Sequence, residues 1–175
     1  KMLYFWKLII SYFIKLKKSI ILFFISCIIL SCEPDDICLS SIPDTPKLII
    51  VFYDESSGLK KEVTNLKIQG SNNEKIYQFK TTDSIAVPLK NLEKITNYSF
   101  VKDFKENVDN SGNNDNILIN YQYNHIYISR ACGYFSNYDL NQIVIENDNF
   151  NWIIKSEIMN SAVKDEKVIH VKIFH

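Results

Sequence analysis

Glycine, proline and arginine are all scarce in this sequence. The chain has four glycines, four prolines and a single arginine among its 175 residues. A loop that cradles phosphate with its backbone needs clustered glycines, and the absence of such a cluster disfavours a phosphate-binding enzyme. The GxSxG and HExxH motifs of serine hydrolases and zinc proteases are also missing. The formal net charge is zero, with 20 basic and 20 acidic residues, which argues against a dedicated nucleic-acid-binding protein.

What is present suits one folded domain, because 46% of the residues are hydrophobic and 23% are charged. The charges are unevenly distributed. Residues 1–31 contain five lysines and no acidic residue, which leaves 15 basic and 20 acidic residues in 32–175. Residues 32–175, the body of the protein, therefore have a net charge of −5. An acidic body strengthens the case against nucleic acid and against electrostatic adhesion to anionic lipid.

Residues 1–31 have the order of a secretory signal peptide. Basic residues precede a short apolar run over 19–30. Because a membrane span needs about 20 residues, this run is too short for a stable transmembrane helix. The segment Ile29-Leu30-Ser31-Cys32 resembles the lipobox of bacterial lipoproteins, in which cleavage precedes the cysteine. The resemblance implies cleavage after Ser31, a diacylglycerol on the sulfur of Cys32 and an acyl chain such as palmitate on the new amine.

Two alternatives to this anchor remain open. Residues 2–30 could span the membrane uncleaved if the lysines snorkel, which would leave Cys32 as an ordinary thiol. Cleavage before Cys27 is the other alternative, and Phe24 at its third preceding position disfavours it. Two or three acyl chains hold a protein at a membrane essentially permanently. We therefore predict a lipid-anchored protein of the outer membrane, on its periplasmic face or at the cell surface.

The cysteines that remain after processing predict a disulfide. If Cys27 leaves with the signal and Cys32 carries lipid, Cys38 and Cys132 are left in an oxidising compartment, where two thiols form a bond. The alternative is that Cys132 is a small buried hydrophobic residue and Cys38 a free thiol.

The mature chain is predicted to be all-β. Residues 32–46 form the lipidated N-terminus and a solvated tether, and residues 47–175 form one domain. Residues 117–124 alternate apolar and polar side chains, the period of a half-buried strand, and a hairpin is expected at Tyr123-Asn124. A polar loop is expected at 107–116. The predicted strands are 47–53, 62–69, 75–80, 84–89, 96–102, 117–124, 125–131, 142–146, 151–158 and 167–174. Their number and spacing predict an antiparallel β-sandwich, immunoglobulin-like or transthyretin-like.

Few residues of the domain suggest chemistry. Arg130, the single arginine, lies in a predicted strand among several tyrosines. A salt bridge on the strand face is the main interpretation of Arg130, and contact of Arg130 and Tyr127 with an anionic ligand is the alternative. His170 and His175 are five residues apart near one strand and should point to opposite faces, so we expect them to share no metal.

The oxygen donors Asp109, Ser111, Asn113 and Asp115 alternate as in a calcium loop. The glycine and the terminal glutamate of an EF-hand are not at their required positions, so we interpret this segment as a solvated loop. We expect neither a metal ion nor a cofactor.

Four blocks of the chain resemble a family of Bacteroidetes envelope lipoproteins catalogued as a domain of unknown function. The blocks are Ser31-Cys32 with Asp35 to Cys38, Thr45 to Ile50 leading to Phe52-Tyr53-Asp54, Asp83-Ser84-Ile85, and Ile128 to Tyr134. The resemblance implies a lipid-anchored envelope protein and supplies no catalytic residues. We expect a non-enzymatic module that binds or scaffolds an envelope protein or glycan. An envelope hydrolase or lyase, with a site assembled from residues such as Arg130, His125 and Tyr127, is the alternative.

Overall fold

The computed structural model describes residues 15–21, 23, 37–39, 41, 42 and 44–175. The chain divides into two units, one made of Lys1–Leu39 with Ser129–Cys132, the other of Ser40–Ile128 with Gly133–His175. In the first unit residues 15–21 are helical. None of the helical residues that can be described forms a helix long and apolar enough to cross a membrane. The predicted cleavage after Ser31, the lipidated Cys32 and the competing site at Cys27 all lie outside the described residues.

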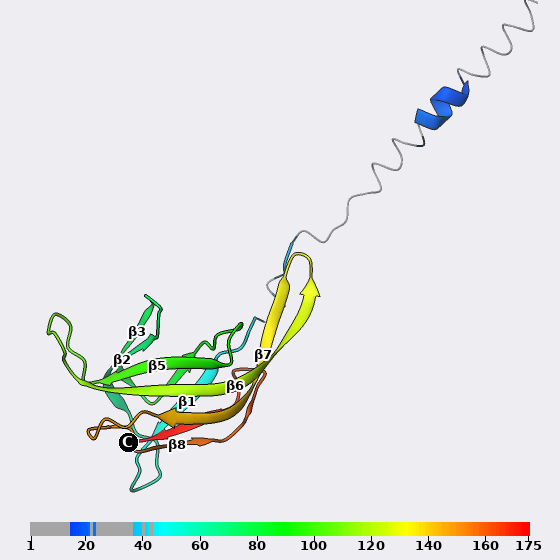
Figure 1. Ribbon diagram of the computed structural model, residues 1–175. Coiled ribbons are helices and arrows are strands. Elements are labelled where there is room, and N and C mark those ends of the chain that lie inside the picture. The colour runs from blue at the N-terminus through cyan, green and yellow to red at the C-terminus, as the bar shows by residue number, and fades with distance from the viewer. Residues whose placement is uncertain (1–14, 22, 24–36, 40, 43) are drawn as a thin grey trace, which may run out of the picture. The chain divides into compact units, whose positions relative to one another are not determined.

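The second unit consists of two β-sheets packed on one another, so the predicted all-β sandwich is confirmed (Figure 1). A four-stranded sheet has the order β4-β1-β10-β8, and a six-stranded sheet has the order β3-β2-β5-β6-β7-β9. The strands are β1 (Leu48–Tyr53), β2 (Val63–Gly70), β3 (Ile76–Thr82), β4 (Ser84–Val87), β5 (Ile95–Lys102), β6 (Asn113–Ser129), β7 (Gly133–Ile145), β8 (Lys155–Ile158), β9 (Ala162–Val163) and β10 (Val171–Phe174).

Side chains from the facing sides of both sheets form one core. The alternation in β1 and β10 places residues such as Phe52 and Ile173 inward, in one cluster with Ile68 and Phe100 of the larger sheet. These β-branched and aromatic side chains fit a pleated surface that is buried on one face. Burying each of them contributes roughly 1.5–3 kcal/mol, which makes this core the main source of stability.

Three buried tyrosines clasp the loop between β4 and β5. The hydroxyls of Tyr98, Tyr138 and Tyr121 donate hydrogen bonds to the carbonyl oxygens of Pro88, Leu89 and Lys90, three consecutive residues. We call these three side chains the tyrosine clasp. They come from β5, β7 and β6, so the clasp joins three neighbouring strands to one loop. Desolvation is the main cause of the raised pKa of all three hydroxyls, and that of Tyr138 reaches about 12, so they stay protonated as donors.

One strand pairing differs from the antiparallel prediction. β10 pairs in parallel with β1, with Ile50 opposite Val171 and Tyr53 opposite Phe174. The C-terminal strand thereby lies between β1 and the antiparallel β8 in the middle of the smaller sheet. Local periodicity carries no information on strand direction, so this pairing could not be read from the sequence.

The predicted hairpin at Tyr123-Asn124 is wrong. Both residues lie inside β6, which runs without interruption over 17 residues to Ser129. The chain turns at 130–132 instead and enters β7 through Gly133, whose φ of 69° costs a glycine no steric strain. Neither Tyr123 nor Asn124 has a glycine beside it, so the predicted turn lacked the residue that the actual turn uses.

Other element boundaries shift for similar reasons. The polar loop before β6 ends at Gly112, because Asn113 to Asn116 pair with β5. β7 begins well before the predicted 142–146 strand, β8 covers only the second half of the predicted 151–158 strand, and β10 only the second half of 167–174. The two-residue β9 was not predicted. An Asn-rich segment can thus extend a strand when a partner strand pairs with its backbone N–H and C=O groups.

Two glycines with positive φ give a test of the β5–β6 turn. At Gly112 (φ 82°) an added Cβ would collide with the carbonyl oxygen of Lys102, whereas at Gly58 (φ 66°) it would meet nothing within 4 Å. We expect Gly58→Ala to cost about 1 kcal/mol from backbone strain alone. Gly112→Ala should cost about 3 kcal/mol or more, because strain and overpacking add. Urea denaturation of both variants measures this difference, and equal costs would contradict the close approach at Gly112.

Candidate functional site

The outer half of the β6–β7 hairpin leaves the core of the sandwich. Along β6, Ile117, Ile119 and Tyr121 are buried on the inner face. The next residues of the same face, starting with Tyr123 and ending with Tyr127, become progressively exposed. Figure 1 shows these parts of β6 and β7 extending beyond the other strands. We call residues 122–128 and 133–137 the hairpin arm.

Aromatic rings continue the inner face along the hairpin arm. The ring of His125 lies 4.8 Å from that of Tyr123 and 6.4 Å from that of Tyr134 across the pair. The rings of Tyr127 and Tyr134 are 5.1 Å apart, while these two residues are 55% and 66% exposed. Paired tyrosines with this exposure form an amphipathic surface of the kind found at interfaces.

The structure places Arg130 in the turn that follows β6, and not in a strand as predicted. The turn belongs to the first unit, and Arg130 is exposed. The predicted strand position of Arg130 is therefore wrong, while its salt bridge and its contact with an anionic ligand stay predictions. Tyr127 lies three residues earlier, on the hairpin arm.

The predicted disulfide between Cys38 and Cys132 is confirmed. Their Cα atoms are 4.9 Å apart, and their sequence separation is 94. The amide of Cys132 donates a hydrogen bond to Oγ of Ser129 at 3.1 Å, which closes the turn. The bond joins the segment before the domain to the turn between β6 and β7.

A histidine–serine pair lies on the hairpin arm, and no sequence motif points to it. Nδ1 of His125 is 2.8 Å from Oγ of Ser136. The amide of Ser136 donates to Oγ1 of Thr45 at 3.0 Å, and Ser136 is only 2% exposed. A catalytic serine must reach its substrate. His125 could act as the base for Ser136, but the hydroxyl of Ser136 is buried away from any substrate.

The other two histidines flank β10, one directly before it and one directly after it, far from the hairpin arm in sequence. The ring of His170 is fully buried, and its Nδ1 accepts a hydrogen bond from the amide of Ile49 at 3.0 Å. His175 is 7% exposed and its ring packs against Phe52 and Trp152. Burial lowers the pKa of both histidines. Among the residues that the structure describes, no three His, Cys, Asp or Glu side chains are grouped to hold a metal.

Two members of the predicted polar loop have structural partners. Asp115 belongs to β6 and is 1% exposed, and its Oδ2 accepts a hydrogen bond from the amide of Ile153 at 2.7 Å. Desolvation raises the pKa of Asp115, opposed by hydrogen bonds from residues 151–153. Ser111 Oγ accepts from the amide of Lys105 and donates to its carbonyl, both at 2.8 Å. These contacts fix the β5–β6 and β7–β8 loops.

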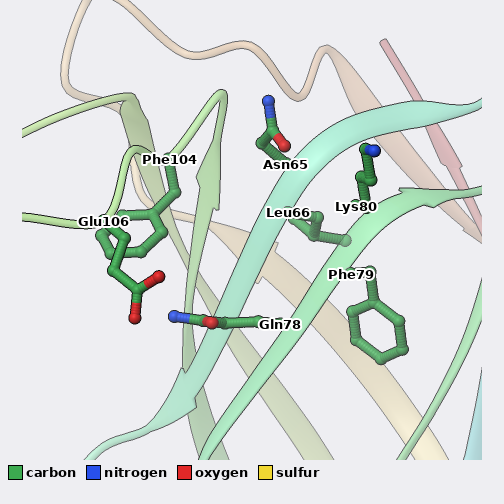
Figure 2. A pocket seen from close by; sticks show the side chains of 7 residues that line it. All are labelled: Asn65, Leu66, Gln78, Phe79, Lys80, Phe104 and Glu106. Carbon is green, nitrogen blue, oxygen red and sulfur yellow. The ribbon is translucent and has the colours of Figure 1, made fainter.

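A hollow of about 240 Å³ lies beside β2, β3 and the loop after β5. Figure 2 shows the Gln78 amide and the Glu106 carboxylate facing one another beside the ring of Phe104. The other lining residues are Asn65, Leu66, Phe79 and Lys80. These described residues include no histidine, cysteine or serine, and the ionisable groups of the hollow are the Glu106 carboxylate and the Lys80 amine.

A model of the family of unknown function DUF6452 matches residues 65–175. The match begins within β2 and includes the hairpin arm and Cys132. No curated protein and no solved structure matches the chain.

The buried ring of His170 predicts a dependence of stability on pH. Its pKa is lowered in the folded protein from an ordinary value of 6.5, and the nearby Asp165 and Glu166 only partly oppose this shift. Below pH 6.5 the unfolded chain therefore binds more protons, so stability falls as the pH is lowered. His170→Asn keeps an acceptor for Ile49 and cannot titrate. Between about pH 7.5 and 5.5, we expect the free energy of unfolding of this variant to fall less steeply with decreasing pH. The difference in slope should be at most about 1.4 kcal/mol per pH unit. Denaturation at several pH values measures both slopes, and identical slopes would refute the assignment.

Proposed function

Since the chain belongs to the DUF6452 family, whose function is unknown, we propose from its own residues that it is a lipid-anchored envelope protein of the outer membrane. It acts as a non-enzymatic module that binds or scaffolds another envelope component, protein or glycan. The Cys38–Cys132 disulfide is the observation that carries this proposal. Disulfides persist in oxidising compartments, so the bond supports export, and the Ser31-Cys32 sequence supplies the route.

The histidines and the serine of the described part of the chain favour a binding role over a catalytic one. The nearest approach to a catalytic pair is His125 with Ser136, and the serine is buried. The two histidines with lowered pKa values are built into the core. A hydrolase or lyase using His125, Tyr127 and Arg130 remains the second candidate. The observation that favours it is the contact of 2.8 Å between Nδ1 of His125 and Oγ of Ser136.

We infer a binding surface on the turn after β1 and the loop between β7 and β8. Leu59 on the turn, and Phe150 and Ile154 on the loop, are 69%, 80% and 59% exposed. The loops that carry them are linked, because Nζ of Lys155 lies 3.2 Å from Oε1 of Glu55 and the amide of Ile154 donates to the carbonyl of Phe174. Binding residues are often carried on loops that a rigid scaffold positions, which supports this assignment. We call Leu59, Phe150 and Ile154 the loop-end surface.

Lipidation is tested on protein extracted from membranes. We expect the mature N-terminal peptide to begin at Cys32 and to carry the mass of the acyl chains. A Cys32→Ser variant should lack the lipid and leave the membrane on washing, because the acyl chains supply most of the affinity. Intact-mass spectrometry with peptide mapping measures both. A terminus at Met2 would support the uncleaved span, and a terminus at Cys27 the competing cleavage site.

The loop-end surface is tested by crosslinking in cells. A photoreactive phenylalanine analogue replaces Phe150, and in a control protein it replaces Ile76, which is 45% exposed on the edge strand β3. We expect a discrete adduct from position 150 and none from position 76, because only the first lies on the loop-end surface. Mass spectrometry of the adduct identifies the bound component. The same adducts from both positions, or none from position 150, would contradict the assignment.

A further inference from the structure

We propose that the hairpin arm rests in the headgroup layer of the membrane that holds the lipid anchor, and that the Cys38–Cys132 disulfide keeps it there. This inference rests on the proposed lipid at Cys32. It assigns Tyr127 and Tyr134 to lipid contact, and it leaves the loop-end surface for a partner.

The disulfide shortens the distance over which the anchor can act. Without the bond, the path from Cys32 to the hairpin arm runs to Thr45, whose Oγ1 accepts a hydrogen bond from the amide of Ser136, whereas the bond offers a shorter path to Cys38. A fully extended chain spans at most about 3.4 Å per residue, which gives about 45 Å for the first path and about 20 Å for the second. Because the Cα atoms of Cys38 and Cys132 are 4.9 Å apart, the turn after β6 stays within about 25 Å of the lipidated residue.

The strand that follows the disulfide brings the hairpin arm with it. β7 begins at Gly133, the residue after Cys132, and Tyr134 comes next. Since β7 has 13 residues, its far end at Ile145 lies about 40 Å away along an extended strand, at roughly 3.3 Å per residue. The short tether therefore restrains the hairpin arm much more tightly than the loop-end surface.

The composition of the hairpin arm suits a membrane interface. Residues 116–138 contain no aspartate or glutamate, although residues 32–175 have a net charge of −5. The fixed charge within 116–138 is the guanidinium of Arg130, a group that can contact lipid phosphate. Tyrosines are enriched where bilayers meet water, because the ring is apolar and the hydroxyl stays hydrated. The exposed pair of Tyr127 and Tyr134 has this character.

These observations favour lipid over a protein or glycan as the occupant of the hairpin arm. A protein partner there would have to fit between the arm and a bilayer that the tether holds within about 25 Å. The absence of carboxylates from 116–138 removes the repulsion by lipid phosphate that the rest of the acidic body would meet.

The test uses the lipidated protein in phosphatidylcholine vesicles whose acyl chains are brominated near the headgroup, since bromine quenches tryptophan on contact. Tyr134→Trp places a reporter on the hairpin arm, and the control Phe150→Trp places one on the loop-end surface. Trp152 is buried at 8% exposure and gives both proteins the same background. We expect the emission of Tyr134→Trp to fall in brominated relative to unbrominated vesicles, and that of Phe150→Trp to stay unchanged.

Two changes then separate the role of the disulfide from that of the anchor. In the Tyr134→Trp background, Cys38→Ser with Cys132→Ser should bring quenching down to the level of the control while the protein still sediments with vesicles. Circular dichroism verifies that this variant is folded. Inserting about 12 glycine and serine residues after Asp36 leaves the disulfide intact and should have the same effect, because the added chain extends the reach by about 40 Å.

The outcomes distinguish the two proposals. Unquenched Tyr134→Trp on protein that sediments with vesicles overturns the membrane contact and leaves the lipid anchor standing. Quenching that survives both tether changes overturns the role of the disulfide. Protection of the reporter from an aqueous quencher without quenching by bromine would place it against protein, in the same chain or a second copy, and would also overturn the proposal. Protein that carries no lipid and does not sediment overturns the anchor, and this inference with it.

Discussion

The base of the long hairpin is held by the tyrosine clasp. Tyr121 of β6 and Tyr138 of β7 lie with their rings 5.2 Å apart at nearly a right angle, and their hydroxyls reach the carbonyls of Lys90 and Leu89. Thr96 ties the same loop from β5, because its Oγ1 lies 2.7 Å from the Tyr121 hydroxyl and accepts from the amide of Lys90. A buried carbonyl that loses its donor costs about 1–3 kcal/mol. The position of the loop between β4 and β5 therefore depends on these hydroxyls. The hairpin arm begins directly beyond Tyr121 in β6.

This arrangement separates two roles along a single pair of strands. The first half of β6 alternates buried apolar and exposed polar residues and builds the core. Its second half keeps the alternation, but within the described part of the chain the facing sheet leaves Tyr123, His125 and Tyr127 partly or largely exposed. Strand pairing with β7 satisfies the backbone there, so the hairpin arm can persist without a core of its own. Side chains on this arm are therefore available to contact something outside the chain.

The sequence predicted the class of fold because strand identity is mostly local. β1, β2, β3, β4 and β5 lie within one or two residues of their predicted positions, since β-branched runs closed by polar turns specify them. The disulfide was predicted because Cys38 and Cys132 are the cysteines left after processing and export exposes them to an oxidising compartment. That reasoning needs no knowledge of the fold. What failed depends on distant partners. The length of β6 is set by its neighbours in the sheet, and the parallel pairing of β10 by β1, at the opposite end of the domain's sequence. The His125–Ser136 pair arises only from the register of the hairpin, so no spacing along the chain could reveal it.

Fixing both ends of the hairpin arm has a mechanical consequence. Its base is fixed by the tyrosine clasp, and the turn at its other end is bonded covalently to Cys38. An isolated two-stranded ribbon is marginally stable in water, so an arm of this kind needs support beyond its own ladder. The clasp limits bending at the base, and the disulfide removes the freedom of the turn to open, since chain entropy makes closure of a loop of about 95 residues worth up to about 5 kcal/mol.

The same two attachments set the route that force would take through the domain. With a lipid at Cys32, pulling from the membrane would enter through the turn bonded to Cys38 and continue along β7. It would then reach the core at Tyr138, whose hydroxyl holds the carbonyl of Leu89. Force entering by this route would load the β6–β7 ladder at its base, where the hydroxyls of Tyr121 and Tyr138 hold the loop after β4.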